Sequence, residues 1–111
     1  MVKYFTNTFL ATKVSFANEM YNICQQLDLD YDKVVEYATY DERLGKSHWA
    51  VPGPDGDFGY GGHCLPKDLS AIVSEFDTYG LLEAVEQVND QVREDRDWEH
   101  MVGRAVLEEE E

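Results

Sequence analysis

Positive charge is scarce in this 111-residue sequence. Nine Lys and Arg residues stand against 23 Asp and Glu residues, which gives a formal net charge of −14. A surface of that sign repels phosphate backbones and anionic lipids, so neither nucleic acid nor a membrane surface is expected as a partner. No apolar run approaches the roughly 18 residues of a membrane span, and the first residues lack the layout of a signal peptide. We therefore expect a cytoplasmic chain.

Cysteine is almost as scarce, with only Cys24 and Cys64. Thiols stay reduced in a cytoplasmic chain, so no structural disulfide is expected. No CxxC or HxxxH spacing occurs, which argues against a zinc site. Each thiol therefore requires its own explanation, and from composition alone the leading one is a small buried hydrophobe.

Glycine and proline are absent from the first 27 residues. Apolar residues recur there at helical steps of three, four and seven. They are Val2, Phe5, Phe9, Phe16, Met20, Ile23 and Leu27. This pattern predicts one long helix over 2–27, and at about 1.5 Å per residue it is long enough for its two ends to serve different neighbourhoods. We find no convincing strand and no internal repeat.

Three shorter helices are predicted beyond it. Asp30 can cap the first of them, a short helix over about 31–38. The next is expected to begin near Pro66–Asp68, since proline suits a first helical turn, and to end at Gly80 as a left-handed stop. The fold class is therefore all-α, with a long N-terminal helix, about three shorter helices and a Gly/Pro-rich loop over 45–62.

The last predicted helix starts at Leu81 and has apolar residues in 4-3-4 spacing up to Val92. Its apolar face resumes at Met101, Val102 and Val106 after the charged stretch REDRD, where we expect the helix to fray or bend. Residues 107–111 read LEEEE, a like-charge run with nothing to pack, and are expected to be a disordered acidic tail. The predicted domain is thus 1–106.

The stretch GYGGHCLPKD places Cys64 behind three glycines and ahead of Pro66, Lys67 and Asp68. Neither the P-loop pattern nor the Rossmann strand, GxGxxG and helix occurs here. Glycines let a ligand approach the main chain, and a cysteine just before a helix start, near a lysine, has its thiolate favoured by the helix dipole. Asp68 is equally well explained as a helix-start carboxylate or as a catalytic residue.

Three motifs in order, VKYFTNTFLATKVSFANE, YDERLG and GYGGHCLPKD, resemble the central domain of the UDP-glucose/GDP-mannose dehydrogenase family, most closely the bacterial-type UDP-glucose 6-dehydrogenases. The resemblance extends over nearly the whole chain. It implies an NAD-dependent, two-step oxidation of a nucleotide sugar, in which the second step passes through a cysteine thiohemiacetal and thioester. It also implies a homodimer formed through the helical domain.

Matching positions suggest roles for individual residues. The resemblance implies that Cys64 is the nucleophile, that Lys3 and Asn7 hold the oxyanion, and that Asp68 assists proton transfer. Substrate contacts are implied for four further residues, Arg43, which would reach the partner subunit's site, and Phe58, Tyr60 and Gly61 of the sugar loop. Three polar or thiol residues carry no such match and are interpreted as helix surface, polar interface and core, namely Lys13, Asn18 and Cys24.

The sequence departs from the family in having no GxGxxG and no second nucleotide-binding domain. We therefore expect no NAD to bind this chain, and the chain alone to be catalytically silent, working as a fragment or with separately encoded dehydrogenase domains. The alternative is a non-catalytic dimerisation or interaction protein derived from the family. UDP-glucose is the expected sugar, with UDP-N-acetyl sugars and GDP-mannose left open.

Overall fold

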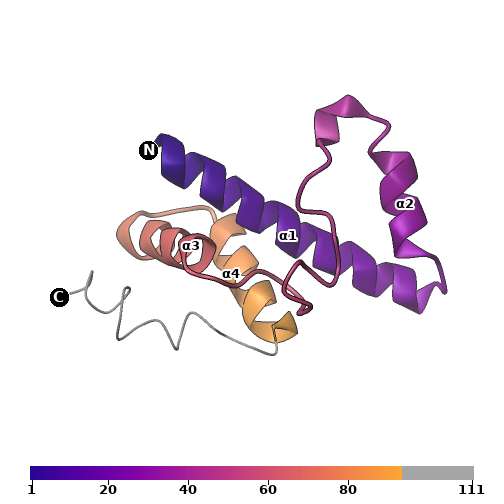
Figure 1. Cartoon of the computed structure of the whole chain (residues 1–111). Helices are drawn as coiled ribbons and strands as arrows, with labels where there is room; N and C mark the ends of the chain where they lie inside the picture. Colours follow the sequence, from indigo (N-terminus) through magenta and orange to yellow (C-terminus); the bar gives the residue numbers. More distant parts are fainter. Residues whose placement is uncertain (94–111) are drawn as a thin grey trace.

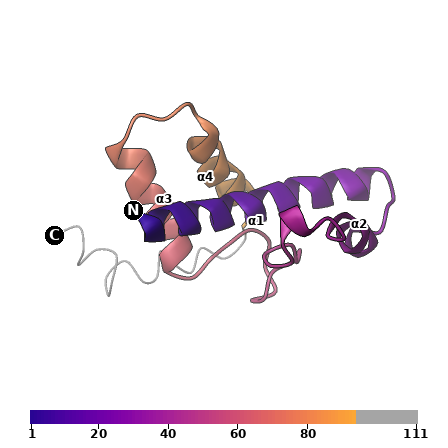
Figure 2. The same cartoon turned by 90° about the horizontal axis from the view of Figure 1, so that it is seen from above.

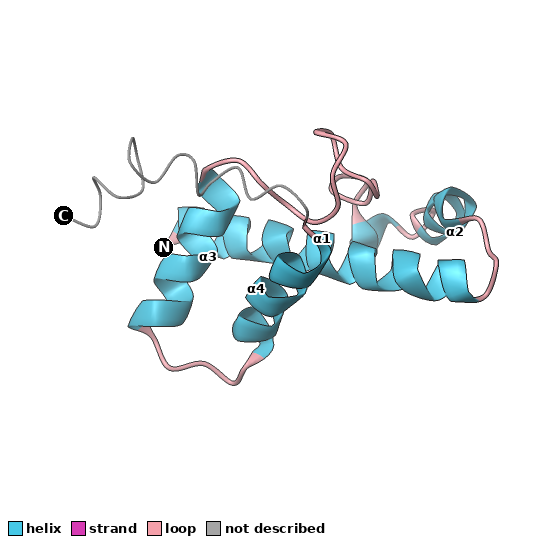
Figure 3. Cartoon of the chain, turned by 90° about the horizontal axis from the view of Figure 1, so that it is seen from below, coloured by secondary structure: helices cyan, strands magenta, loops and turns pink. Residues whose placement is uncertain are grey.

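The computed structural model describes residues 1–93, and this part is all helical with no strand. The elements are α1 (Val2–Gln26), α2 (Tyr31–Ala38), the 3-10 turn η1 (Glu42–Leu44), α3 (Cys64–Glu75) and α4 (Leu81–Val92). The predicted all-α class, with one long N-terminal helix and shorter ones, is confirmed (Figure 3). Within residues 1–93, every helix is too short or too polar to span a lipid bilayer.

Helix α1 is the axis on which the other helices are arranged (Figures 1 and 2). Helices α3 and α4 pack against its N-terminal and middle turns, whereas α2 lies at its C-terminal end. The two ends of α1 therefore do serve different neighbourhoods. The long loop between η1 and α3 runs back along α1 and connects the neighbourhoods at its two ends.

Two apolar clusters hold these parts together. The first joins α1, α3, α4 and the loop, and its buried members are Ala11, Val14, Tyr60, Leu69 and Val85. The second joins the C-terminal half of α1 to α2 and the loop, and its buried members are Ala17, Cys24, Tyr31 and Val51. Cys24 is 3% exposed, so its interpretation as a core residue is confirmed.

Helix α2 forms as predicted, because its cap is local. The Asp30 carboxylate accepts hydrogen bonds from the backbone N–H groups of Asp32 and Lys33, two donors that the helix itself leaves unpaired. Tyr31, the first helical residue, is buried, and its hydroxyl donates to the carbonyl of Trp49 at 2.6 Å. This contact fastens α2 to the long loop, while burial raises the pKa of the Tyr31 phenol to about 12.

Two predicted helix boundaries are wrong. Helix α3 begins at Cys64, so the cysteine is the first helical residue and Pro66 sits inside the first turn, where its missing N–H costs nothing. Gly80 does not end α3, which finishes at Glu75. It precedes α4 with φ 105°, because the chain leaves α3 through the extended residue Phe76 and a left-handed residue then turns it into the next helix. Three further predictions lie outside the described residues, namely the bend at REDRD, the apolar face at 101–106 and the 107–111 tail.

Substituting Leu69 tests the first cluster. Leu69 is fully buried on α3, so Leu69→Ala is expected to lower the free energy of unfolding by about 3 kcal/mol through lost burial and a residual cavity. Leu81 is 66% exposed, and Leu81→Ala is expected to change it by less than about 0.5 kcal/mol. Urea unfolding followed by circular dichroism, at one fixed protein concentration, measures both. Equal losses would contradict this packing.

Candidate functional site

A buried carboxylate forms the centre of the candidate site. Asp68 on α3 has no exposed surface. Asn7 on α1 donates a hydrogen bond from Nδ2 to Asp68 Oδ2 at 2.7 Å. The ammonium of Lys3, one turn earlier on α1, lies 3.7 Å from Asp68 Oδ1, and that of Lys67 lies 4.0 Å from the same oxygen. The structure thus brings together three of the four residues assigned to catalysis.

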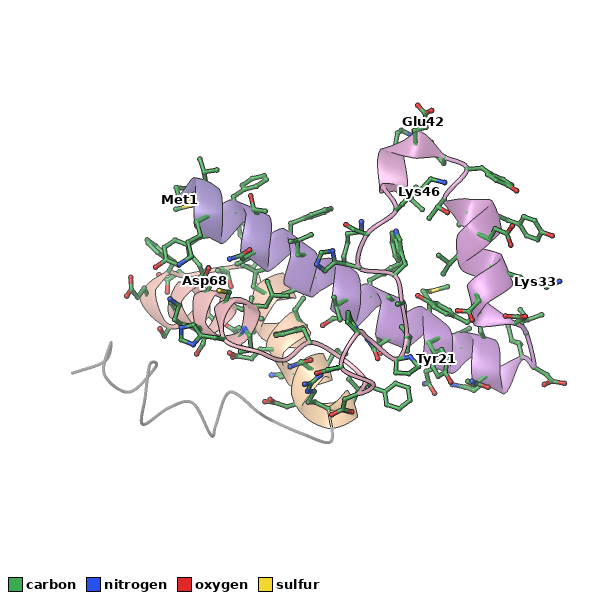
Figure 4. All side chains as sticks on the ribbon, viewed as in Figure 1. Met1, Tyr21, Lys33, Glu42, Lys46 and Asp68 are labelled. Atoms are coloured by element: carbon green, nitrogen blue, oxygen red, sulfur yellow. The ribbon has the colours of Figure 1, made fainter. Side chains whose placement is uncertain are left out.

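Asp68 lies where α3 meets the N-terminal half of α1 (Figure 4). An unpaired charge in a protein interior costs several kcal/mol, so the two lysines and the amide are what makes this carboxylate tolerable. Asp68 Oδ1 accepts no hydrogen bond, although its oxygen faces the ammonium of Lys3. The side chain therefore keeps one acceptor position available for another donor.

Cys64 has an exposed thiol and forms no disulfide. The interpretation as a buried small hydrophobe is therefore wrong for Cys64. As the first residue of α3 it lies at the positive end of the helix dipole. Asp68 follows four residues later on the same helix face, one turn away. An exposed cysteine, a buried carboxylate, two ammonium groups and one amide donor are thus found in the first half of α3 and the facing turns of α1.

Phe58, Tyr60 and Gly61, the loop residues expected to contact the sugar, contribute to the core, to a cavity or to both. Tyr60 is 5% exposed within the first cluster, and burial together with the charges of Glu86 and Asp90 raises the pKa of its phenol. Phe58 packs on Tyr21 with ring centroids 5.7 Å apart. Phe58 thus acts in packing, whereas Tyr60 and Gly61 also line a cavity of about 470 Å³.

That cavity includes residues that the sequence did not single out. Besides Tyr60 and Gly61, it is lined by Gly62, Leu65, Ser47 and His48. Ser47 and His48 come from the other end of the long loop, and only the folded loop brings them beside the GYGG stretch. A lone Ser-His pair in a loop carries no spacing signal from which this could be predicted.

Arg43 is not brought to the Asp68 cluster. Its guanidinium, 89% exposed, pairs with the carboxylate of Asp41 at 2.6 Å, and this pairing lowers the pKa of Asp41. Its neighbour Glu42 and Asp68 lie at well-separated places in the same chain (Figure 4). Arg43 therefore does not reach that cluster within one chain.

The interpretation of Lys13 as a helix-surface residue is wrong. It is 8% exposed, its ammonium donates to the carbonyl of Leu44 at 3.0 Å, and the ammonium lies 4.8 Å from the ring centroid of Trp49. The Trp49 indole donates to the carbonyl of Gly45 at 2.9 Å. Lys13 is buried because the chain after η1 supplies a carbonyl and an aromatic face in place of water.

The sequence also missed two side chains that bind the loop backbone, Asn89 and Arg93. Asn89 accepts from Tyr60 N–H at 2.7 Å and donates to Tyr60 C=O at 3.0 Å. Arg93, with a side chain 1% exposed, pairs with Asp55 and lies 3.5 Å from the carboxylate of Asp57. A polar residue on the amphipathic α4 and an arginine directly after it give no local sign of these partners.

The described residues do not suit a metal ion or NAD. Across residues 1–93, no group of three His, Cys, Asp or Glu side chains could hold a metal ion. NAD does not fit this part of the chain either, because the strand and glycine turn that would lead a helix to its pyrophosphate do not occur in residues 1–93. The chemistry available from these residues is nucleophilic addition, oxyanion binding and proton transfer.

Residues 1–93 thus form a helical domain in which an exposed cysteine begins the helix that carries a buried, lysine-paired aspartate. Residues 1–91 match the model of the UDP-glucose/GDP-mannose dehydrogenase family, central domain. The chain therefore belongs to that family, and the resemblance stated from the motifs is confirmed.

Curated relatives agree with this assignment. UDP-glucose 6-dehydrogenase TuaD of Bacillus subtilis is 37% identical over 97 residues, which is 84% of this chain and 20% of the relative. UDP-glucose 6-dehydrogenase YwqF of the same organism is 43% identical over 94 residues, 80% of this chain and 20% of the relative. UDP-glucose 6-dehydrogenase AglM of Haloferax volcanii is 38% identical over 94 residues, 81% of this chain and 21% of the relative. The chain spans about a fifth of the length of these relatives. No solved structure matches it.

The pair between Asp55 and Arg93 makes stability depend on pH. The hydrogen bond from Arg93 lowers the pKa of Asp55 in the folded chain, so its stabilising contribution is present above the unfolded pKa, about 3.9, and is lost as the pH falls through the lower folded value. Asp55→Asn should therefore be less stable than the wild type at pH 7, and the difference should shrink below about pH 4.

Urea unfolding at pH 7, 5, 4 and 3 measures this difference. Asp77→Asn, at an exposed position in the connection between α3 and α4, is the matched control and is expected to show no such narrowing. A difference between wild type and Asp55→Asn that stays constant down to pH 3 would show that the pair adds nothing.

Proposed function

We propose that this chain is the central domain of a UDP-glucose-type 6-dehydrogenase and supplies its cysteine nucleophile and its dimer interface. The observation that carries the proposal is the cluster of Lys3, Asn7 and Asp68 next to Cys64. A domain used only for dimerisation has no need of an accessible thiol beside a buried carboxylate, whereas aldehyde oxidation through sulfur needs both.

The arrangement suits thiol addition to an aldehyde. The Cys64 thiolate forms a carbon–sulfur bond to the aldehyde carbon, and the carbonyl electron pair moves onto oxygen. The Lys3 ammonium and the Asn7 amide are the donors suited to that oxyanion, because they gain strength as its negative charge develops. Asp68 is suited to hold the proton that this oxygen, or a water attacking a later thioester, gives up or takes.

The two oxidations require a nicotinamide cofactor that the described residues do not hold. Geometry within a few ångströms is needed between cofactor and sugar, so the 111-residue chain is proposed to be inactive alone and to work with a cofactor-binding domain. The names of the relatives point to UDP-glucose, and the family name also includes GDP-mannose.

Helix α1 presents an uncovered apolar stripe that supports the dimer. Five exposed residues make up this stripe, Val2, Phe5, Phe9, Phe16 and Ile23. Their 3-4-7 spacing places them along one side of α1. A contiguous apolar surface of this kind marks an interaction site, and a two-fold pairing of two α1 helices covers both copies at once. Arg43, exposed on η1 and remote from its own Asp68, is proposed to serve the partner subunit's site.

The second candidate is a non-catalytic interaction protein that uses only this stripe. The same exposed residues favour it, since they require a covering partner whether or not chemistry occurs. The behaviour of Cys64 separates the two candidates.

Alkylation of Cys64 is the deciding experiment. The native chain is treated with iodoacetamide at several pH values, and the labelling rates of Cys64 and Cys24 are compared by peptide mass spectrometry, with and without UDP-glucose. We expect Cys64 to react faster than the buried Cys24, and UDP-glucose to slow it severalfold. The same protein with NAD and UDP-glucose should form no NADH.

Cys64 labelling that UDP-glucose leaves unchanged would favour the non-catalytic candidate. NADH formation by the purified chain would refute the proposed need for another domain.

Phe9 tests the dimer. Phe9→Glu places a charge in the stripe and should raise the dimer dissociation constant by at least about tenfold, because burying an aromatic side chain contributes about 2 kcal/mol. Phe76→Glu is the matched control, since Phe76 is 55% exposed against 57% for Phe9 but lies at the end of α3. Sedimentation equilibrium at micromolar concentrations measures both. A wild-type chain that is monomeric throughout that concentration range would refute the proposed dimer.

A further inference from the structure

The loop that leads to Cys64 has no regular hydrogen bonds of its own between Phe58 and Tyr60, and side chains replace them. Asn18 on α1 accepts from Gly59 N–H at 3.1 Å. Asn89 on α4 makes the two bonds to Tyr60 described above. Arg93, directly after α4, donates from Nη1 to the Phe58 carbonyl at 3.4 Å. We call Asn18, Asn89 and Arg93 the loop clamp.

The clamp is buried and therefore holds the loop firmly. Asn18 is 5%, Asn89 2% and Arg93 6% exposed. Buried peptide groups must find partners, and here each partner comes from a rigid helix or its end instead of from a neighbouring strand. Asn89 uses its donor and its acceptor on one residue, which fixes both the position and the rotation of the Tyr60 peptide groups.

Gly59 shows how closely the clamp fits the backbone. Its φ is +71°, and a Cβ at that position would lie 2.2 Å from Asn89 Oδ1. Any other residue would be strained by its own conformation and would also push the Asn89 amide away from Tyr60. The approach of α4 to the loop thus depends on this glycine.

Arg93 joins the clamp to the first half of the loop. Its guanidinium faces Asp55, Asp57 and the Phe58 carbonyl. A planar fork can meet several acceptors at fixed angles, which a lysine cannot do. The loop is therefore pinned on both sides of Gly59, which lines the cavity.

We propose that Asn18, Asn89 and Arg93 are positioning residues for the nucleotide-sugar site. They hold the segment from Phe58 to Tyr60, and through it Gly61 and Gly62, in the shape that receives the sugar beside Cys64. This inference rests on the proposed function. The clamp acts on substrate capture by removing loop freedom before binding, and not on the sulfur, whose environment is set by the start of α3.

Asn89→Ala is the test, with Asn22→Ala as its control, because Asn22 is exposed on α1. Hydrogen exchange should accelerate at the amides of Gly59 and Tyr60 by about tenfold or more, and the UDP-glucose concentration that half-protects Cys64 from iodoacetamide should rise by a similar factor. Without ligand, Cys64 labelling should stay within about twofold of the wild type. Asn22→Ala should change none of these values.

A general loss of structure would instead also increase the labelling of Cys24 and reduce helicity. Should Asn89→Ala fail to fold, Arg93→Lys keeps the buried charge but not the fork, and should weaken UDP-glucose protection with helicity unchanged. If the variants fold but keep the wild-type hydrogen-exchange rates at Gly59 and Tyr60, or the wild-type protection of Cys64 by UDP-glucose, the proposed role of the loop clamp is refuted.

A wild-type Cys64 that UDP-glucose does not protect overturns the proposed function and, with it, the positioning role. The failure of the proposed function is thus seen in the wild type, whereas failure of the clamp alone is seen only in the variants.

Discussion

The buried carboxylate of Asp68 sets the relation between α1 and α3, on which the remaining arrangement depends. Removing a carboxylate from water costs several kcal/mol, and the cost is offset only if cations and donors reach it. Asn7 and Lys3 do so from successive turns of α1. The N-terminal part of α1 must therefore lie at one rotation and one height against α3, and this fixes where the first residue of α3, Cys64, is presented.

The long loop also has buried polar groups that need partners, in this case the N–H and C=O groups of its backbone. It crosses the core without forming a strand, so its peptide groups are paired by Asn18, Asn89 and Arg93. Two apolar clusters fill the space on either side, one around Leu69 and one around Cys24. Polar side chains thus determine the path of the loop, and apolar ones determine how tightly the helices close around it.

Helix α1 and the capped α2 could be predicted from the sequence because their signals are local: unbroken apolar periodicity in one and Asp30 before the other. Gly80 was misassigned because a left-handed glycine suits the end of one helix as well as the turn into the next. Lys13 and Asn89 could not be predicted as buried, since their partners are Leu44 and Tyr60, far away in the sequence. The cluster of Lys3, Asn7 and Asp68 was reached only through the family resemblance.

Most positions of the long helix α1 take part in a contact or in the exposed apolar stripe, so few of them can be substituted without consequence. One side meets α3 and α4, with Lys3 and Asn7 held toward Asp68 and with Ala11 and Val14 in the first apolar cluster, and a second side carries the exposed apolar stripe. Few positions lie off these two sides, and those with exposed polar side chains are Thr6, Glu19, Asn22, Gln25 and Gln26. Substitutions that disturb none of these contacts are therefore expected only at these exposed polar positions, most of which lie in the last two turns of α1.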